Sequence, residues 1–354
     1  GEEAERLARR IVECVGAPYE LNGHRVVVGC SVGISMSPGD GTTGEKLLKN
    51  ADVALYRAKM EGRGTWRFFE PEMDLQAQKR RDMERDLRAA FSNGEFELHY
   101  QPLLHLEDGR VSCCEALLRW RHPERGTISP ADFVPVAEDT GLINDLGHWV
   151  LNTACREAVN WPDHIHVAVN VSPIQFKSQT LALNVAAALA ASGLAPARLE
   201  LEITEAVLIR DDDAALDILH QLRELGVRIA LDDFGTGYSS LHYLANFQFN
   251  KIKIDRSFVA NTSHSETSRA IVQSVVSLGR SLGLEIVAEG VETDGQAQMM
   301  ALFGCTALQG YYFSRPVNAD QLAGLVEAHE PWKVQPVAKP AWPEPPKAPR
   351  KASA

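Results

Sequence analysis

The chain has 354 residues, of which 45% are hydrophobic and 23% charged, the proportions of an ordinary globular protein rather than of a fibrous or disordered one. A formal net charge of −11 argues against binding DNA or RNA polymers through their phosphates, but it leaves room for bound metal cations. No apolar run approaches the roughly 18–20 residues of a membrane span, and the first twenty residues carry charges where a signal peptide would be apolar. We therefore expect a soluble, cytoplasmic segment; a longer parent chain could still carry a membrane anchor or sensory domains upstream.

The six cysteines form no CxxC pair, which argues against a metal or redox motif. Cys113 and Cys114 are adjacent within an expected strand, where neighbouring side chains point to opposite faces. We interpret all six as reduced thiols, mostly with a packing role.

The N-terminal region predicts only a few α/β elements. Its pattern favours a helix over 4–15, a strand over 25–35, a helix over 43–61 and a strand over 65–69. These are too few for a complete α/β domain, so we expect a partial domain at 1–70. A helical connector is predicted at 71–91, because residues 72–91 contain neither Gly nor Pro. Residues 331–354 are rich in Pro, Ala and Lys without apolar periodicity, which predicts a disordered tail.

Between residues 92 and 328 the pattern alternates between strands and helices. Eight strands are predicted, at 96–104, 111–120, 166–173, 198–207, 228–234, 251–255, 285–291 and 308–314. A helix is predicted over 268–282, where apolar residues recur at helical spacing. Eight strands with intervening helices favour an α/β fold of the TIM-like (βα)8 barrel class, and a doubly wound open sheet is the structural alternative.

Polar residues gather at the C-terminal ends of seven of these strands. They are Glu115, Asn170, Glu202 with Glu205, Asp232 with Asp233, Lys253 with Asp255, Glu289 with Glu292, and Gln309. One such carboxylate is usually a helix cap or a turn residue, but in a barrel all these ends converge on one rim, where the catalytic residues of barrel enzymes lie. The pattern therefore predicts one polar pocket.

Several carboxylates in one pocket repel each other unless protons or cations compensate. A ligand set made only of oxygen favours Mg²⁺ or Mn²⁺ over Zn²⁺. Asp232 and Asp233 could serve two ions, an arrangement that suits phosphoester hydrolysis. Lys253 is expected to stay protonated among the carboxylates and to position phosphate or water, and an aldolase-like Schiff base is the minor alternative.

These residues also carry a family resemblance. Glu115-Ala116-Leu117, followed by Leu118-Arg119-Trp120, resembles the motif that names the EAL family of cyclic di-GMP phosphodiesterases. The rest of the family pattern follows in order, as VNVS at Asn170, LELEITE at Glu202 and Glu205, DDFGTGYSSL from Asp232, KIKID at Lys253 and Asp255, AEGVE at Glu289 and Glu292, and LQGYYFSRP at Gln309. The match covers roughly residues 80–328.

The resemblance implies roles for individual residues. Two Mg²⁺ or Mn²⁺ ions would be bound by Glu115, Asn170, Glu202, Asp232 and Asp233, with Asp255 as a ligand or an assisting group, and Ca²⁺ would be inhibitory. Glu289 would help to hold or activate the attacking water, and Lys253 would orient it. Together with Glu115 these are the implied catalytic residues. Gln101, Leu118, Arg119 and Gln309 match positions that contact the substrate.

The resemblance also extends to assembly. The GTGYSS stretch after Asp233 resembles a loop that the family associates with dimer coupling and metal binding, with Glu205 and Glu292 as its anchors. A homodimer through this domain is therefore expected. Gly235 and Gly237 give the segment the backbone freedom that such a loop needs.

The first seventy residues carry a second resemblance. CSVGIS from Cys30, ADVALYRAK from Ala51 and GRG from Gly62 are similar to the C-terminal half of a GGDEF diguanylate cyclase domain. Lys59 and Arg63 match phosphate contacts of that family. The half that would carry the GGDEF turn is not in this sequence, so we expect this segment to be catalytically silent.

The function implied is metal-dependent hydrolysis of cyclic di-GMP to linear pGpG in bacterial second-messenger signalling. A catalytically silent cyclic di-GMP receptor is the alternative, and a scaffold without nucleotide is a third. The intact motifs favour the enzyme, because members of the family that only bind the nucleotide tend to lose metal ligands or the loop.

Overall fold

A computed structural model describes residues 1–178, 180–208, 212–235 and 241–327. The chain divides into two units, Gly1–Ala89 and Ala90–Ala354. The predicted tail at 331–354 and residues 236–240 of the GTGYSS stretch, Gly237 among them, lie outside the described residues. Each unit is therefore considered by itself.

The first unit is a small α/β fragment. It contains α1 (Glu2–Gly16), β1 (Tyr19–Leu21), β2 (His24–Val26), β3 (Val32–Ile34), α2 (Gly44–Met60) and β4 (Trp66–Phe68). Strands β1 and β2 are antiparallel, whereas β3 and β4 are parallel. The strand predicted over 25–35 is wrong as one element, because residues 27–31 are not in a strand and separate β2 from β3.

The helix predicted over 72–91 is present as α3 (Pro71–Asn93). Its beginning packs against α2, where Met73 joins Val53 and Ala54 in a small apolar cluster. Lys49 of α2 forms an ion pair with Asp74 at 3.4 Å. The start of the connector is thus fixed to the first unit by both apolar and charged contacts.

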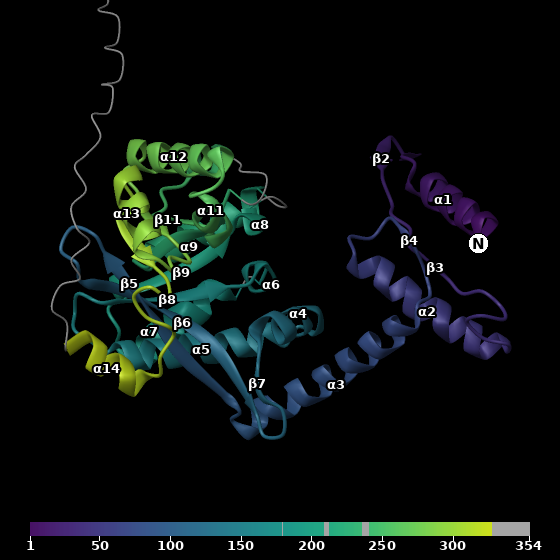
Figure 1. Ribbon diagram of the computed structural model, residues 1–354, viewed down its shortest axis with the longest axis horizontal. Helices are drawn as coiled ribbons and strands as arrows, with labels where there is room; N and C mark the ends of the chain where they lie inside the picture. Colours follow the sequence, from purple (N-terminus) through teal and green to yellow (C-terminus); the bar gives the residue numbers. More distant parts are fainter. Residues whose placement is uncertain (179, 209–211, 236–240, 328–354) are drawn as a thin grey trace, which may run out of the picture. The chain divides into compact units, whose positions relative to one another are not determined.

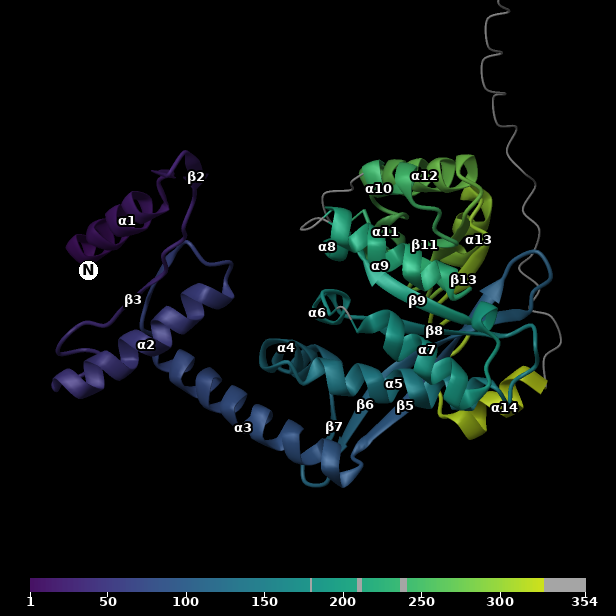
Figure 2. The same cartoon turned by 180° about the vertical axis from the view of Figure 1, so that it is seen from behind.

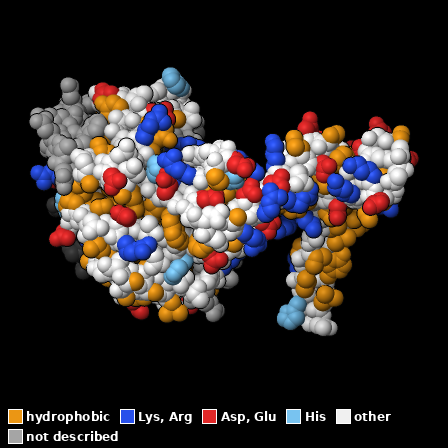
Figure 3. All heavy atoms as spheres, turned by 90° about the horizontal axis from the view of Figure 1, so that it is seen from below, with side chains coloured by type: hydrophobic (Ala, Val, Ile, Leu, Met, Phe, Trp, Pro, Cys, Tyr) orange, Lys and Arg blue, Asp and Glu red, His pale blue; other side chains and the backbone are white. Residues whose placement is uncertain are grey.

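The first unit leaves large apolar side chains uncovered. Figure 3 shows hydrophobic side chains on its surface, and Leu21, Val27 and Leu48 are all more than half exposed. A complete domain normally buries side chains of this kind. Their exposure agrees with a fragment that lacks part of its core.

The second unit is a closed barrel of eight strands, which confirms the barrel prediction. Around the barrel the strands are β5 (Phe96–His105), β13 (Ala307–Gln309), β12 (Glu285–Ala288), β11 (Lys251–Ile254), β10 (Arg228–Phe234), β9 (Leu199–Thr204), β8 (His166–Val171) and β6 (Val111–His122). Pairing of β5 with β6 closes the ring. The short β7 (Gly126–Ile128) pairs with the far end of β6.

The first barrel strand departs from the expected alternation. Strand β5 is antiparallel to both β13 and β6, and residues 106–110 join β5 to β6 without a helix. The turn contains Gly109 at φ +68°, a conformation that glycine adopts without strain. The Asp108-Gly109 pair was the signal of a hairpin in the sequence.

Helices cover the outside of the barrel (Figures 1 and 2). They are α4 (Pro130–Thr140), α5 (Ile143–Ala158), α6 (Pro173–Phe176), α7 (Leu181–Ser192), α8 (Glu205–Leu208), α9 (Asp212–Glu224), α10 (Leu241–Asn246), α11 (Arg256–Asn261), α12 (Glu266–Ser281), α13 (Asp294–Phe303) and α14 (Ala319–Glu327), with a 3₁₀ turn at Pro196–Arg198. Their apolar faces and the outward strand residues form one large core. Among the described residues, no helix is both long and apolar enough to cross a membrane.

The barrel interior has a second layer beneath the rim. Because side chains alternate along a strand, the residue two positions before each rim residue also points inward. On β6, β8, β12 and β13 these residues are apolar, namely Cys113, Ala168, Val287 and Ala307. Together with Leu103 of β5 they form a separate buried cluster. On β9 and β11 they are Glu200 and Lys251, which are fully buried.

Glu200 and Lys251 form an ion pair inside the barrel. Lys251 Nζ lies 2.6 Å from Glu200 Oε1, and Arg228 Nε lies 3.2 Å from Glu200 Oε2. Burial opposes charge on the lysine, but Glu200 raises the pKa of Lys251 above its usual value. The pair is therefore ionised and joins β9 to β11 through the barrel interior.

Replacement of Lys251 by Met should destabilise the barrel, because it leaves the Glu200 carboxylate buried with Arg228 as its remaining partner. The expected loss is about 3 kcal/mol in the free energy of unfolding. The double variant Lys251→Met/Glu200→Gln should recover part of the loss. Urea unfolding followed by tryptophan fluorescence measures both, with exposed Lys177→Met as the control. A Lys251→Met protein as stable as this control would contradict the prediction.

Candidate active site

The structure brings most of the predicted polar residues to one end of the barrel. Glu115, Glu202, Asp232, Lys253 and Gln309 are nearly or fully buried there, each from a different strand. Gln101 joins them from β5, where it pairs in register with Glu115. Since β5 runs antiparallel to its neighbours, Gln101 reaches this end from the middle of its strand rather than from its C-terminal end.

The ammonium group of Lys253 lies among four carboxylates. Its Nζ is 2.6 Å from Glu289 Oε1 and 2.8 Å from Glu202 Oε2, with Asp232 Oδ1 at 3.4 Å and Glu115 Oε2 at 3.5 Å. Burial disfavours the charged form, but Asp232 and the other carboxylates raise the pKa of Lys253 well above its usual value. A lysine in this state is not a Schiff-base nucleophile, which argues against the aldolase-like reading.

Amide side chains hold Glu115 from the other side. Asn170 Nδ2 donates to Glu115 Oε1 at 2.6 Å, and Gln309 Nε2 donates to Glu115 Oε2 at 2.6 Å. Gln309 Nε2 also donates to Gln101 Oε1 at 3.3 Å, and Gln101 Nε2 donates to the carbonyl of Ser314 at 3.1 Å. Asn170 uses its nitrogen in this contact, so its carbonyl oxygen remains a possible ligand for a cation.

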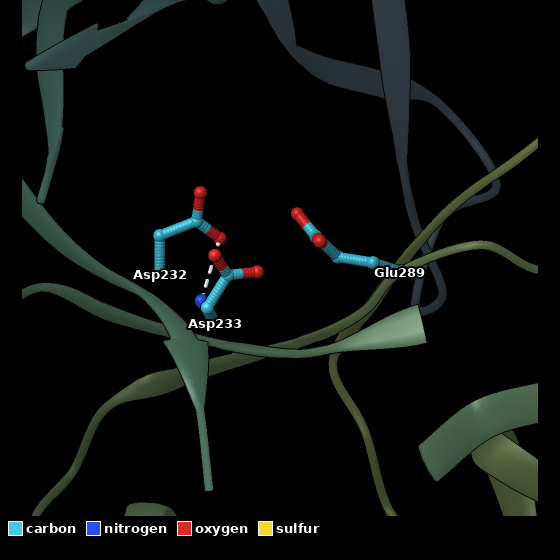
Figure 4. Close-up of side chains that lie close together, drawn as sticks. All are labelled: Asp232, Asp233 and Glu289. Atoms are coloured by element: carbon cyan, nitrogen blue, oxygen red, sulfur yellow. Dashed lines mark hydrogen bonds between the residues drawn. The ribbon is translucent and has the colours of Figure 1, made fainter. Parts of the chain in front are cut away.

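Two adjacent aspartates lie on the same side of the chain because the end of β10 is irregular. In a regular strand Asp232 and Asp233 would point to opposite faces. Asp233 instead has φ +53°, and the register with β11 shifts between Leu231 and Phe234. The Asp233 backbone amide donates to Asp232 Oδ1 at 3.0 Å. Figure 4 shows both carboxylates directed toward Glu289 of the loop after β12.

These three carboxylates could hold a metal ion. One oxygen from each of Asp232, Asp233 and Glu289 lies within 4.8 Å of the others. Hard oxygen donors at this spacing suit a divalent cation such as Mg²⁺ or Mn²⁺. The donor chemistry of the residues present therefore fits the metal dependence that the sequence predicts.

Burial and mutual repulsion raise the pKa of several acids in this cluster. Burial, together with Asp232 and Glu115, raises the pKa of Glu289 to about 8 despite the nearby Lys253. Burial and then Asp232 raise the pKa of Asp233 to about 6. Burial and then Glu115 raise the pKa of Glu202 well above its usual value. Without a metal, part of this cluster is thus protonated near neutral pH.

Glu115 is the exception in this group. Burial opposes its ionisation, but Lys253 and the hydrogen bonds from Gln309 and Asn170 together hold the pKa of Glu115 below its usual value. Lys253 thus stands beside carboxyl groups whose pKa values are shifted in opposite directions, downward for Glu115 and upward for Glu289. The ionised form of Glu115 is therefore favoured.

A cleft of about 210 Å³ opens above these residues. Its lining includes Gln101, Glu115, Asp232, Glu289, Glu292 and Gln309 from the predicted set. Leu117 also lines the cleft, whereas Leu118 packs against the outer core and is not among the lining residues. Strand alternation explains the difference, because Leu117 shares the inward face with Glu115.

Other predicted residues lie at the margins. Arg119 is half-buried, does not line the cleft, and donates from Nη1 to the carbonyl of Leu118. Glu205 begins α8, and its Oε1 accepts a long hydrogen bond of 3.4 Å from the Gly235 amide. Asp255 caps α11 through the Ser257 amide and contributes to the raised pKa of Asp233. Glu292 has an exposed side chain.

The cleft also contains residues that sequence reasoning missed. Besides Leu117, these are Arg256, Gly290, Gly310 and Tyr311. At Gly310 a Cβ atom would lie 2.0 Å from the Val291 carbonyl oxygen, so only glycine permits this approach of β13 to the loop after Glu289. Gly290 lies in the motif AEGVE and Gly310 in the motif LQGYYFS, so these two motifs were the sequence signal for both glycines.

Comparison with known families agrees with this geometry. Residues 84–316 match the sequence model described as EAL domain. This chain belongs to the EAL domain family. Residues 1–65 match the model described as "Diguanylate cyclase, GGDEF domain". The EAL domain is thus preceded by a GGDEF fragment, as predicted.

Curated relatives share both parts. The chain is 45% identical over 328 residues to the "Bifunctional diguanylate cyclase/cyclic di-GMP phosphodiesterase MucR" of Pseudomonas aeruginosa, covering 92% of this chain and 48% of that protein. It is 40% identical over 331 residues to "Cyclic di-GMP phosphodiesterase NbdA" of the same organism, covering 92% of this chain and 42% of that protein. The chain therefore spans less than half the length of these relatives.

Solved structures resemble the barrel. The structure described as "PaMucR Phosphodiesterase, c-di-GMP complex" has a TM-score of 0.66 at 46% identity, and the match covers 68% of this chain and 99% of that one. The cGMP-bound form of the EAL enzyme Bd1971 has a TM-score of 0.69 at 32% identity, with 80% of this chain and 75% of that chain covered.

In the GGDEF fragment, Lys59 and Arg63 are both exposed, near the end of α2 and in the turn that follows it. Arg63 has φ +61°, and its backbone amide donates to the carbonyl of Ala58. Their match to phosphate contacts stays a prediction.

Binding of Mn²⁺ to the EAL domain should release protons, because carboxyl groups with raised pKa must lose their protons to become ligands. The pKa of about 8 at Glu289 and about 6 at Asp233 places this effect between about pH 6 and pH 8. Within that window the affinity for Mn²⁺ should rise with pH, and above it the affinity should level off.

Calorimetric titration in two buffers of different ionisation enthalpy measures the released protons. The variant Glu289→Gln should release fewer protons and should show a weaker pH dependence than the wild type. Equal wild-type affinities at the two ends of the window would contradict the raised pKa values.

Proposed function

We propose that this EAL domain hydrolyses cyclic di-GMP to linear pGpG. The observation that carries the proposal is the buried Lys253 ammonium among four carboxylates, beside the Asp232 and Asp233 pair, beneath a cleft that Asp232 and Glu289 line. MucR and NbdA, relatives at 45% and 40% identity, are named as cyclic di-GMP phosphodiesterases, which supports the choice of substrate.

Two divalent cations, Mg²⁺ or Mn²⁺, belong to this proposal. The residues that would hold them are Glu115, Asn170, Glu202, Asp232 and Asp233, with Asp255 as a ligand or an assisting group. When bound, such ions lower the pKa of a water molecule and stabilise the charge that develops on the phosphate oxygens. The 4.8 Å grouping of Asp232, Asp233 and Glu289 supports a site of this kind.

The chain's own side chains position the reacting groups. Lys253 keeps its proton and orients the attacking water together with Glu289, which lies 2.6 Å from the ammonium group. The water oxygen bonds to phosphorus, the bond from phosphorus to one ribose 3′ oxygen breaks, and a proton ends on that oxygen. Because the pKa of Glu289 is raised to about 8, Glu289 must first lose its own proton, and its carboxylate can then accept a proton during this step.

Substrate contacts come from the lining of the cleft. Gln101 and Gln309 offer amide groups to the bases or phosphates, and their mutual hydrogen bond keeps them in place. Leu118 remains a proposed substrate contact, and Leu117, which lines the cleft, is proposed as a further apolar contact. Arg119, whose planar fork of donors suits a phosphodiester, remains a proposed contact.

The wider context is also proposed. The family associates the loop after Asp233, with Glu205 and Glu292 as its anchors, with dimer coupling, and this supports a homodimer through the EAL domain. The six cysteines are free thiols, which supports a cytoplasmic segment. A silent cyclic di-GMP receptor is the alternative function. The presence of each expected acidic residue at the barrel rim favours the enzyme.

The purified chain, incubated with cyclic di-GMP and Mg²⁺ or Mn²⁺, should produce pGpG detectable by chromatography. Asp232→Asn should stay folded and should lose at least about 100-fold in rate, because an amide lacks the charge that holds a divalent cation. Exposed Asp217→Asn on α9 is the matched control and should keep its activity. Ca²⁺ should support binding with little turnover.

If the chain binds cyclic di-GMP tightly but forms no pGpG with any divalent cation, the phosphodiesterase proposal fails and the receptor function takes its place. Full activity of Asp232→Asn would contradict the ligand assignment.

The GGDEF fragment should make no cyclic di-GMP from GTP, because the turn that would hold the nucleotide's phosphates is missing. The same chromatographic assay with GTP as the only nucleotide tests this. The Asp232→Asn variant should be used, so that any product is not hydrolysed as it forms. Accumulation of cyclic di-GMP would show that the fragment is active.

A further inference from the structure

The cleft of the EAL domain is acidic, whereas its proposed substrate carries two negative phosphodiester groups. Four carboxylate residues line the cleft, namely Glu115, Asp232, Glu289 and Glu292. Among its described lining residues, Arg256 is the one cationic side chain. One phosphate of the dinucleotide is placed at the acidic cluster for hydrolysis, so the second phosphate needs a positive partner of its own.

Three other cationic side chains of the domain, Lys253, Arg119 and Arg315, do not line the cleft. The charge of Lys253 is shared among four carboxylates beneath the cleft, and the side chain is fully buried. Arg119 lies outside the lining, with Nη1 on the carbonyl of Leu118. The guanidinium of Arg315 lies over the Tyr311 ring, 4.5 Å from its centroid. Lys253 and Arg315 are thus engaged elsewhere, and Arg119, which remains a proposed phosphodiester contact, does not line the cleft.

Arg256 differs from these residues in two respects. It is exposed, and within the described part of the chain no carboxylate forms an ion pair with it. It follows Asp255 directly and begins α11, so its backbone is tied to the end of β11 beside Lys253.

The side-chain stem of Arg256 is fixed by a glycine. Gly290 has φ +64°, and a Cβ atom built on it would lie 2.5 Å from Arg256 Cβ and 3.7 Å from Cγ. The stem therefore rests on the bare backbone of the loop that carries Glu289. A larger residue at position 290 would push it away. The stem thus contacts Gly290, while the guanidinium has no ion-pair partner among the described residues and can accept an anion.

We propose that Arg256 binds the phosphate of cyclic di-GMP that is not cleaved in a given turnover. The inference rests on the proposed function and adds a binding residue to it. A guanidinium can give two parallel hydrogen bonds to the oxygens of one phosphodiester, which a lysine cannot. Because this contact is made before and during the reaction alike, Arg256 lowers KM and leaves kcat nearly unchanged.

The test compares two substrates and three variants. The substrates are cyclic di-GMP and its analogue with one phosphate replaced by a neutral methylphosphonate, which retains one cleavable phosphodiester. Arg256→Gln should raise KM for cyclic di-GMP about 10- to 100-fold, the range expected for a charge-assisted hydrogen bond, with kcat within about threefold of wild type. The same variant should change KM for the analogue less than about twofold.

Two further variants complete the design. Arg256→Lys should restore part of the affinity for cyclic di-GMP, because the charge remains while the paired donors are lost. Arg269→Gln on α12 is the control, a partly buried arginine that pairs with Glu266 and does not line the cleft, and it should behave as the wild type. Thermal unfolding confirms that each variant is folded.

Three outcomes would overturn the proposal. They are an unchanged KM for cyclic di-GMP in Arg256→Gln, an equal rise in KM for both substrates, or a loss confined to kcat. Calorimetric binding of cyclic di-GMP in Ca²⁺ separates these from failure of the proposed function. If the wild type binds and cleaves cyclic di-GMP and Arg256→Gln has the same KM, only this inference fails. If the wild type neither binds nor cleaves cyclic di-GMP, both this inference and the proposed function fail.

Discussion

The Lys253 ammonium among Glu115, Glu202, Asp232 and Glu289 is the interaction on which the rest of the site depends. Four acids converge there because parallel strands bring their C-terminal ends to one rim, and they would repel each other in a buried space. One buried cation offsets part of that repulsion, but it cannot satisfy all four groups. The result is an uneven distribution of protons, in which the pKa of Glu115 is lowered while those of Glu202 and Glu289 are raised. The remaining charge imbalance supports the proposed binding of divalent cations at this site.

The layer beneath the rim explains how Lys253 is held in place. Strand β11 sends both Lys251 and Lys253 into the barrel, and strand β9 sends Glu200 and Glu202 to meet them. The lower pair, Glu200 and Lys251, is fully buried in the barrel interior. A buried ion pair adds little net stability compared with a well-packed apolar pair, but breaking it is costly. Its effect is therefore on register, because a shift of β11 by one residue would turn both lysines out of the barrel.

Much of this architecture could be predicted from the sequence, and the exceptions have physical causes. The barrel and the acidic rim follow from strand spacing and from polar residues at strand ends, which are local signals. The antiparallel strand β5 was missed because direction depends on pairing, although Asp108-Gly109 marked the hairpin. Leu117 could have been expected in the cleft from alternation along β6, because it shares the inward face with Glu115, whereas Leu118 follows from the family motif and stays a prediction. Arg256 could not be found without coordinates, since its significance lies in its contact with Gly290 and in the absence of a carboxylate partner among the described residues.

The acidity of the cleft also constrains the order of events in the proposed reaction. A dinucleotide with two negative charges that approaches Glu115, Asp232, Glu289 and Glu292 meets repulsion unless cations are already present. Lys253 does not remove this repulsion, because its charge is committed beneath the cleft, and Arg256 can neutralise only one phosphate. The affinities for divalent cation and substrate must therefore be coupled, and thermodynamic linkage makes the coupling reciprocal, so that bound substrate strengthens the binding of the cation. An acidic site is thereby compatible with an anionic substrate, because each of the two ligands supplies the charge that the other one needs.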